Sequence, residues 1–313
     1  MNDESGYTKA FCNYLRKGMD AGLEGLASGS DPDGGYLVTP TMSSRIVKSV
    51  HEASTMRQIC SVETISTDAL ELIDDHNKVA AGWSSETATT EDSAPIIAKR
   101  SIPTHELYAQ PKATQKLVDD SAIDVENWLS DKISDIFSRK ENTAFIQGTG
   151  VGMPRGILTF ASGTNWGQIQ QIKSGNQREI TADALVVLFY GLKDCYAKRA
   201  SFIMNRTTAQ TVRLLKLAAT NQFLWQPGLS AGAPDTLLGC PVYLVEDMPS
   251  VSSNSLPIAV GDFQAAYQIV DKRGVRILRD PFTEKPFVKF YTTKRVGGDV
   301  VDFDAVKILK MAD

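Results

Sequence analysis

The stretch VENWLSDKISDIFSRKENTAFIQGTGVGMPRG, residues 125–156, contains a long amphipathic segment followed directly by a cluster of glycines. Apolar residues recur at helical spacing with charged residues between them, which predicts a helix from Val125 to Gln147. Asp124 is placed to be its N-cap. At 1.5 Å per residue the helix is about 35 Å long, which is long for a globular protein.

The glycines of GTGVGMPRG, residues 148–156, raise the alternative of a phosphate-binding loop. Such a loop follows a strand and opens a helix, because phosphate is held by free amide groups at a helix N-terminus. Here the glycines follow a helix, Met153 occupies the place of the third glycine, and the sequence has no Gly-Lys-Ser/Thr. The pattern therefore predicts a helix stop and a tight turn, with Gly148 in the left-handed conformation that ends a helix.

Upstream of the helix, residues 61–116 have the pattern of a long hairpin with a poor core. The runs ALELIDD and ELYAQPKATQKLV alternate like strands, and they flank the small and polar segment GWSSETATTEDSAP, residues 82–95. The apolar content is too low for independent folding. We therefore expect this hairpin to project from the body and to be buried against another chain, which indicates assembly.

The chain before the hairpin has an N-terminal segment and an ordered start. Residues 7–26 carry a short helical pattern weakened by three glycines, and ASGSDPDGG, residues 27–35, is typical of a cleavable linker. Order is expected from near Tyr36, with a brief helix at residues 46–50 and a strand in MRQICSVETI, residues 56–65.

A second compact unit of mixed α/β type is predicted downstream of the glycine turn. Thr181 is placed to cap a helix that carries Leu185 and Leu188 on its apolar face. The segment RTTAQTVRLLKLA predicts another helix, and strands are predicted in SFIMN, PVYLVEDM, LPIAVGDF, AYQIVDK and VRILRD. The tail, residues 281–313, is expected to return as strands alongside the long helix.

The bulk composition is that of a globular protein with an ample core. Of its 313 residues 42% are hydrophobic, and 33 Lys and Arg against 37 Asp and Glu give a formal charge of −4. That balance does not favour bulk attraction to nucleic acid or anionic lipid. The longest uncharged apolar run, residues 184–192, is about half a membrane span, and the acidic N-terminus does not resemble an export signal.

Residue types that carry chemistry are present but form no recognisable site. The histidines are His51, His76 and His105, and the cysteines are Cys12, Cys60, Cys195 and Cys240. No C-x-x-C pair occurs, which argues against a disulfide framework and a zinc site, and the histidines fall in no catalytic motif. We therefore expect no catalytic, cofactor-binding or metal-binding residue, and we predict that the protein is not an enzyme.

The order of these parts resembles the major capsid proteins of tailed phages, the Hong Kong 97 type. The likeness spans about residues 30–312 and is carried by GGYLVTP, QPKATQKLVDDSAIDVENWLSDKI, GTGVGMPRGIL, FIMNRTTAQTVRLLK, LLGCPVYLVEDMP and VGDFQAAYQIVDKRGVRILRD. Each sequence is weak by itself, but their order is specific. The chain is particularly similar to capsid proteins of alphaproteobacterial prophages and of gene transfer agents.

The resemblance implies an α+β fold of the Hong Kong 97 capsid type, with an N-terminal arm, an extended hairpin loop, a peripheral domain with a long spine helix, and an axial α/β domain. The implied divisions are residues 1–35 for the arm and a remnant of a scaffold-like segment, 36–60 for the start of the peripheral domain, 61–116 for the extended loop, 117–175 for the peripheral domain with its spine helix, 176–280 for the axial domain and 281–313 for the closing strands of the peripheral domain.

The same resemblance implies a shell protein that self-assembles into hexamers and pentamers of an icosahedral phage or phage-like particle around double-stranded DNA. The implied partners are other copies of the chain, a scaffold segment, a maturation protease, a portal protein and packaged DNA bound without sequence specificity. No cofactor and no membrane is implied, and the place of the protein is the virion, assembled in the bacterial host cytoplasm. The alternatives are a gene transfer agent capsid and an encapsulin-type nanocompartment shell.

Candidate interface residues can be named within this framework. They are Trp83, Glu86, Glu91, Arg100, Phe223 and Trp225. Basic pairs such as Lys294 and Arg295 lack interleaved aromatic residues, which favours a solvated face or an intersubunit ion pair over contact with packaged DNA.

One departure from the type member concerns covalent cross-linking. That member joins its subunits through a lysine of the extended loop and an asparagine of a closing strand. Here the loop tip SSETATTEDSAP has no lysine, and the matching strand FVKFYTT offers Phe290 in place of asparagine. The sequence therefore predicts a shell without covalent cross-links.

Overall fold

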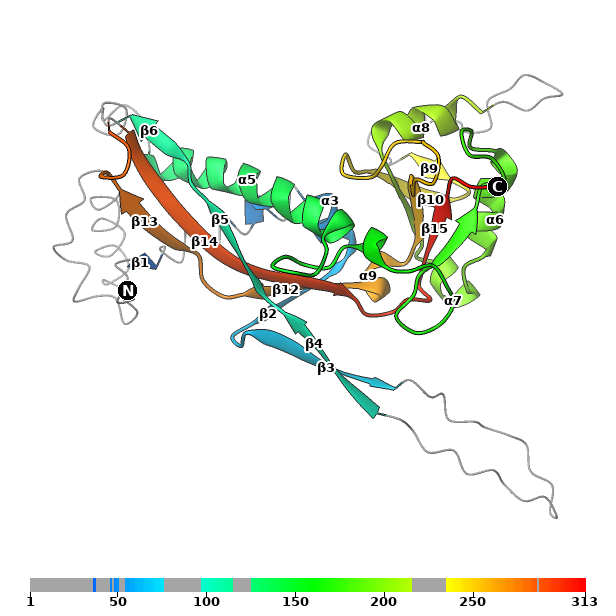
Figure 1. The fold of residues 1–313 in the computed structure, drawn as a ribbon, viewed down its shortest axis with the longest axis horizontal. Helices are drawn as coiled ribbons and strands as arrows, with labels where there is room; N and C mark the ends of the chain where they lie inside the picture. The colour runs from blue at the N-terminus through cyan, green and yellow to red at the C-terminus, as the bar shows by residue number, and fades with distance from the viewer. Residues whose placement is uncertain are drawn as a thin grey trace, which may run out of the picture.

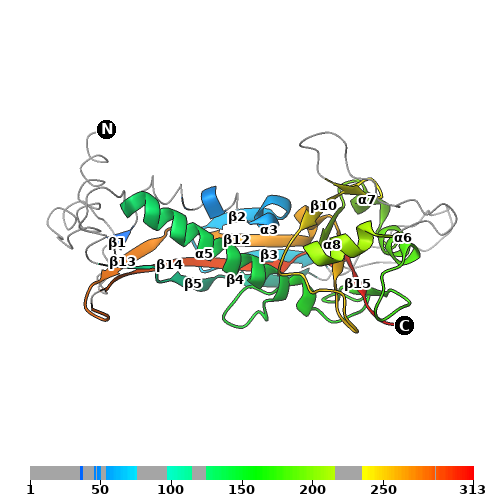
Figure 2. The ribbon, with the colours of Figure 1, turned by 90° about the horizontal axis from the view of Figure 1, so that it is seen from above.

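The computed structural model describes residues 36–37, 46, 48–50, 54–75, 97–114, 125–215, 235–285 and 287–313. They form an elongated part, in which a long helix runs along a sheet, and a compact α/β part at one end (Figure 1). Seen from above, the strands of the elongated part form a thin layer with the long helix beside it (Figure 2). The predicted combination of helices and sheets is confirmed.

The long helix α5 (Val125–Gln147) has the bounds that the sequence predicts. The buried apolar residues of its first half are Leu129, Ile133 and Phe137, which recur every four residues along one face. They pack in a core cluster with Ile277 and Phe290 of the neighbouring sheet. Its length therefore serves to cover a long sheet. Asp124, the expected N-cap, lies outside the described residues.

The turn after α5 ends the helix by a different device from the one expected. Gly148 does not adopt the left-handed conformation, which is found instead at Gly150 (φ 81°) and Gly152 (φ 68°). A Cβ atom at position 148 would lie 2.1 Å from the carbonyl oxygen of Pro154 and 2.4 Å from that of Ala144. Gly148 is needed because the backbone folds back onto itself at this point.

The elongated part is built on a seven-stranded sheet. Its strands are β1 (Tyr36–Leu37), β2 (Ser61–Ile65), β5 (His105–Ala109), β6 (Lys112–Thr114), β12 (Tyr267–Lys272), β13 (Arg276–Asp280) and β14 (Phe287–Val300). The long strand β14 pairs antiparallel with β12 and β13 on one side and with β5 and β6 on the other. The segment MRQICSVETI is not one strand, because the short helix α3 (Thr55–Ile59) precedes β2.

The hairpin pairs differently from the expectation. β3 (Ala69–Asp75) pairs with β4 (Ile97–Pro103), whereas ELYAQPKATQKLV supplies β5 and β6 to the long sheet. Alternation identified these strands but not their partners, because a half-buried strand has the same pattern in a hairpin and in a sheet. The part that projects from the body is therefore the β3–β4 hairpin (Figure 1).

The compact part contains a six-stranded sheet covered by short helices. Its strands are β7 (Gln170–Lys173), β8 (Ser201–Met204), β9 (Thr236–Leu237), β10 (Cys240–Leu244), β11 (Ile258–Gly261) and β15 (Val306–Lys310). The helical segments nearby are η1 (Ile157–Thr159), α6 (Ala182–Tyr190), α7 (Asp194–Ala197), α8 (Arg206–Arg213) and α9 (Phe263–Ala266). The predicted cap of α6 is confirmed, because the Thr181 hydroxyl accepts a hydrogen bond from the Ala184 amide at 3.2 Å.

Two groups of strands belong to the other sheet from the one expected. β12 and β13 were predicted within the compact α/β unit but lie in the long sheet, and β15 was predicted beside the long helix but lies in the compact sheet. These exchanges follow from long-range pairing that no local pattern encodes. The division of the chain into peripheral, loop and axial domains stays a prediction.

Candidate assembly surfaces

The β3–β4 hairpin leaves the body as a ribbon with little core. Its pairing runs from Ala69 with Pro103 to Asp75 with Ile97, and Thr104 closes the base by donating from its amide and its hydroxyl to the carbonyl oxygen of Asp68, each at 2.9 Å. Ile73 is 78% exposed, whereas Ile102 near the base is buried. A ribbon with this distribution of apolar side chains is suited to burial against a partner.

Arg100 fixes the hairpin to the body. Its guanidinium donates to the Asp299 carboxylate at 2.7 Å and lies 5.3 Å from the ring centroid of Phe303, a cation–π geometry. Because Asp299 belongs to β14, this contact sets the direction in which the hairpin leaves the long sheet. Arg100 thus has an intramolecular role, and its place in an interface stays a prediction. Of the other interface candidates, Trp83, Glu86, Glu91, Phe223 and Trp225 lie outside the described residues.

A buried ionic cluster joins α3 and α5 to the long sheet. Arg57 donates to Glu141 at 2.6 Å and to both carboxylate oxygens of Asp271 at 2.7 and 2.8 Å. Lys294 contacts the same two carboxylates at 3.0 and 3.2 Å. Two cations and two anions thus compensate each other, and every side chain is at most 8% exposed.

The pKa values in this cluster follow from burial and mutual attraction. Burial raises the pKa of Asp271, but the Lys294 charge and the hydrogen bonds from Arg57 outweigh it and lower the pKa from 3.8 to about 2. Burial lowers the pKa of Arg57, but its contacts with Asp271 and Glu141 raise it above its ordinary value overall. Both groups are therefore charged at neutral pH, as the cluster requires.

The sequence analysis missed this cluster, although part of its signal was readable. In FVKFYTTKRV, Lys294 has the same parity as Val288, Phe290 and Val296, which face α5. A lysine on the apolar face of a strand predicts a buried anion nearby. The identity of that anion could not be read from the sequence, because Glu141 and Asp271 are far from Lys294 along the chain.

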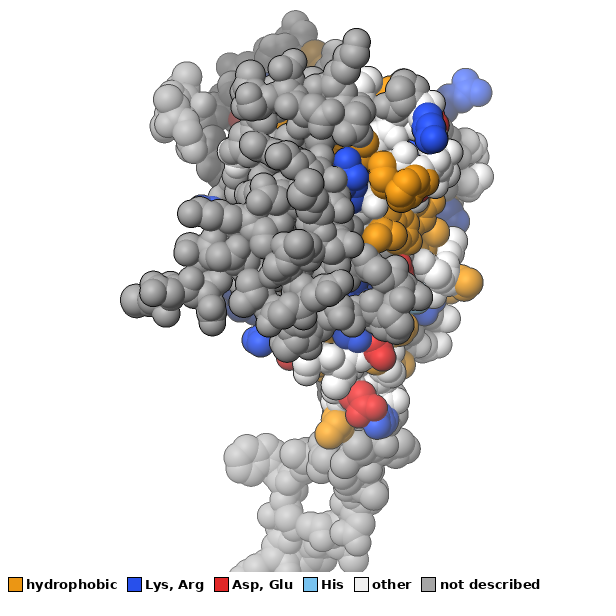
Figure 3. All heavy atoms as spheres, turned by 90° about the vertical axis from the view of Figure 1, so that its left-hand side faces the viewer, with side chains coloured by type: hydrophobic (Ala, Val, Ile, Leu, Met, Phe, Trp, Pro, Cys, Tyr) orange, Lys and Arg blue, Asp and Glu red, His pale blue; other side chains and the backbone are white. Residues whose placement is uncertain are grey.

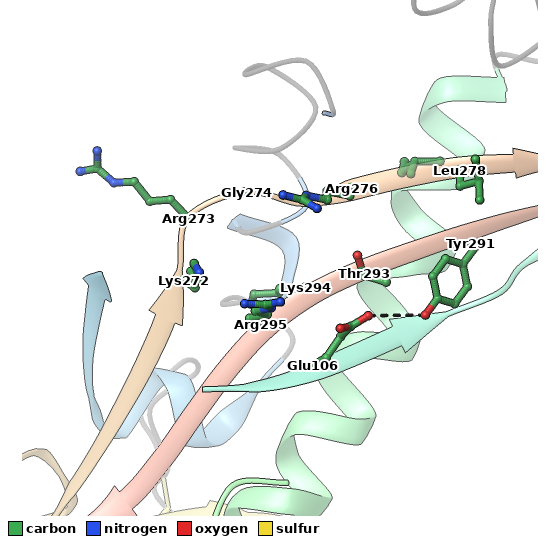
Figure 4. Close-up of a pocket in the computed structure, with 11 residues that line it drawn as sticks. Glu106, Lys272, Arg273, Gly274, Arg276, Leu278, Tyr291, Thr293, Lys294 and Arg295 are labelled. Atoms are coloured by element: carbon green, nitrogen blue, oxygen red, sulfur yellow. Dashed lines mark hydrogen bonds between the residues drawn. The ribbon is translucent and has the colours of Figure 1, made fainter. Parts of the chain in front are cut away.

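The opposite face of the long sheet carries a basic pocket of about 380 Å³. We use the name basic pocket for the hollow around Lys272, Arg273, Arg276, Tyr291, Arg295 and Glu106, shown in Figure 4. Tyr291 and Arg295 point away from α5, since the residues that alternate with them are buried against it. Asp68 accepts from Lys272 at 2.5 Å and from Arg295 at 2.9 Å. Four cationic side chains therefore face two carboxylates around this pocket.

Large apolar side chains are exposed at both ends of the molecule. On α6, Val187 and Tyr190 are 57% and 77% exposed, and Phe282 is 82% exposed in the turn between β13 and β14. That turn lies at the end of the molecule seen in Figure 3, where hydrophobic side chains gather beside Lys and Arg on the described surface. Exposed apolar groups at several separate places are typical of a protein with several partners.

The described histidine and cysteines have environments typical of structural residues. Burial lowers the pKa of His105 on β5, and burial raises the pKa of the Cys60 and Cys240 thiols, which are therefore protonated at neutral pH. Within the described residues, no group of three or more His, Cys, Asp or Glu side chains is arranged to hold a metal ion. No helix in the described part of the chain is both long and apolar enough to span a membrane.

Comparisons with known proteins agree with this geometry. Residues 34–311 match the family described as "Phage capsid family". The solved structure "Capsid of native GTA particle computed with C5 symmetry" is similar, with a TM-score of 0.75 and 40% identity over 96% of this chain and 100% of that chain. "Capsid of empty GTA particle computed with C5 symmetry" also has a TM-score of 0.75, with 43% identity over 83% of this chain and 90% of that chain.

More distant structures share the fold alone. A chain from Microbacterium phage Oxtober96 has a TM-score of 0.59 and 13% identity, and the likeness covers 93% of this chain and 98% of that chain. No curated protein sequence matches the chain.

Proposed function

Because the chain belongs to the phage capsid family and is a major capsid protein that forms the shell of a particle, we propose that its copies assemble as hexamers and pentamers of an icosahedral shell around double-stranded DNA. The likeness to a gene transfer agent capsid, which covers nearly the whole of both chains, carries this proposal. The projecting hairpin and the exposed apolar side chains support it, because they are surfaces that another copy can cover.

The particle is proposed to be of the gene transfer agent type or a closely related prophage. The capsid structures of that type are 40–43% identical to this chain, whereas the listed phage structures are 11–14% identical. A scaffold segment, a maturation protease and a portal protein are proposed as partners, with assembly in the host cytoplasm. The role of the protein is geometric rather than enzymatic, since many weak contacts repeated over a closed lattice produce a stable shell.

Removal of the hairpin tip tests the proposed mode of assembly. Asp75 and Ile97 are directly paired, so residues 76–96 can be replaced by a two-residue Asn-Gly turn that closes β3 onto β4. The variant is expected to fold with an unchanged melting temperature but to give at least about ten-fold fewer sedimenting particles, equivalent to about 1.4 kcal/mol. Gradient sedimentation and electron microscopy measure the particles. A variant that assembles as well as the unaltered chain contradicts the proposal.

Denaturing gel electrophoresis tests the absence of covalent cross-links. Phe290 is fully buried in the cluster under α5, so this position offers neither the chemistry nor the access that a cross-link needs. Assembled particles are expected to give a single band at the monomer mass of 34.1 kDa. A ladder of covalent oligomers in the same gel is the contradicting result.

A further inference from the structure

We propose that the basic pocket receives the acidic segment of residues 82–95 from a second copy of this chain, an inference that rests on the shell function proposed above. The pocket and the segment lie on different parts of the chain, so the contact is head-to-tail. A head-to-tail contact repeated around an axis closes a ring of subunits.

The charge of the pocket is the first argument. Arg273 and Arg276 are exposed on either side of the turn at Gly274, and Lys272 and Arg295 are beside them. The two carboxylates here, Asp68 and Glu106, leave an excess of positive charge around the hollow. A positive hollow on the face of a sheet attracts a negatively charged partner and orients it.

The composition of the segment is the second argument. GWSSETATTEDSAP contains Glu86, Glu91 and Asp92 and no Lys or Arg, so its charge is opposite to that of the pocket. Its other residues are mostly small, which permits close approach to a sheet. Trp83 has an aromatic surface to meet at the rim, because Tyr108 is 62% exposed and stacks on Tyr291 at 6.1 Å between ring centroids.

The direction of the hairpin is the third argument. β3 and β4 carry the two ends of the segment at Asp75 and Ile97. In Figure 1 they extend away from the long sheet and from the turn between β12 and β13, where Arg273 and Arg276 lie. The hairpin therefore points its own tip away from its own pocket and toward space that a neighbouring copy can occupy.

Reciprocal charge reversal tests this contact in the full chain. Arg273→Glu with Arg276→Glu reverses the pocket, and Glu86→Lys with Glu91→Lys reverses the segment. Each pair alone is expected to reduce the yield of sedimenting particles by at least about ten-fold, and all four substitutions together are expected to restore it to within about three-fold of the unaltered chain. Arg273→Lys with Arg276→Lys keeps the charge and is the matched control, with an expected yield equal to that of the unaltered chain.

Several outcomes overturn the inference. Particles at normal yield from the pocket-reversed chain do so, and so does a four-fold variant that fails to recover. If the pocket-reversed chain makes shells at normal yield that retain less DNA, the pocket binds nucleic acid and not the segment. If the unaltered chain forms no shells under the electron microscope, the proposed function fails as well, which separates the two failures.

Discussion

Replacing Arg57 with methionine is expected to lower the free energy of unfolding by about 3–5 kcal/mol, because the substitution leaves two buried carboxylates with one cation. Glu141 would lose the 2.6 Å contact with Arg57, and Asp271 would lose both of its hydrogen bonds from the guanidinium. Denaturant unfolding of the unassembled chain, followed by circular dichroism, measures the loss.

A matched control is available on the surface of the same helix. Arg139 pairs with Asp135 at 3.1 Å one turn away, and its side chain is 78% exposed. Arg139→Met removes an arginine from an ion pair in water and is expected to change the free energy of unfolding by at most about 0.5 kcal/mol. If Arg57→Met and Arg139→Met have equal effects, the buried cluster is not what attaches α3 and α5 to the sheet.

Gly148→Ala is expected to destabilise the protein by about 3 kcal/mol, because the new methyl group meets backbone atoms that cannot move aside individually. The carbonyl oxygens of Pro154 and Ala144 lie 2.1 and 2.4 Å from the position of the added atom. The same backbone accepts and donates the bonds from Gly148 to Ala144 and from Gly156 to Gly148, each at 2.8 Å. Thermal unfolding of the variant measures the effect as a lower melting temperature.

Gly152→Asn separates lack of space from backbone conformation in this turn. Gly152 has φ of 68°, and nothing lies within 4 Å of the position of its Cβ. Asparagine tolerates the left-handed conformation better than most residues, so this variant is expected to lose less than about 1 kcal/mol. Equal melting temperatures for Gly148→Ala and the unaltered chain would show that the turn can open to admit a methyl group.

Several local features could be predicted because neighbours along the chain determine them. The bounds of α5, the cap at Thr181 and the strand character of β8, β10 and β14 follow from spacing within about twenty residues. The capsid fold was reached by resemblance rather than by spacing. The candidate interface residues stay predictions, except that Arg100 is already paired within the chain with Asp299.

Sequence alone determined the helix, the turn after it and the identity of most strands, because hydrophobic period and turn chemistry are local properties. Tertiary structure decided which sheet each strand joined, with β12 and β13 placed beside β14 and β15 placed in the compact sheet. It also brought Arg57, Glu141, Asp271 and Lys294 together and built the basic pocket from three separate segments. The physical reason is that strand pairing and charge compensation join residues far apart in the chain, and their partners exist only once the backbone has folded.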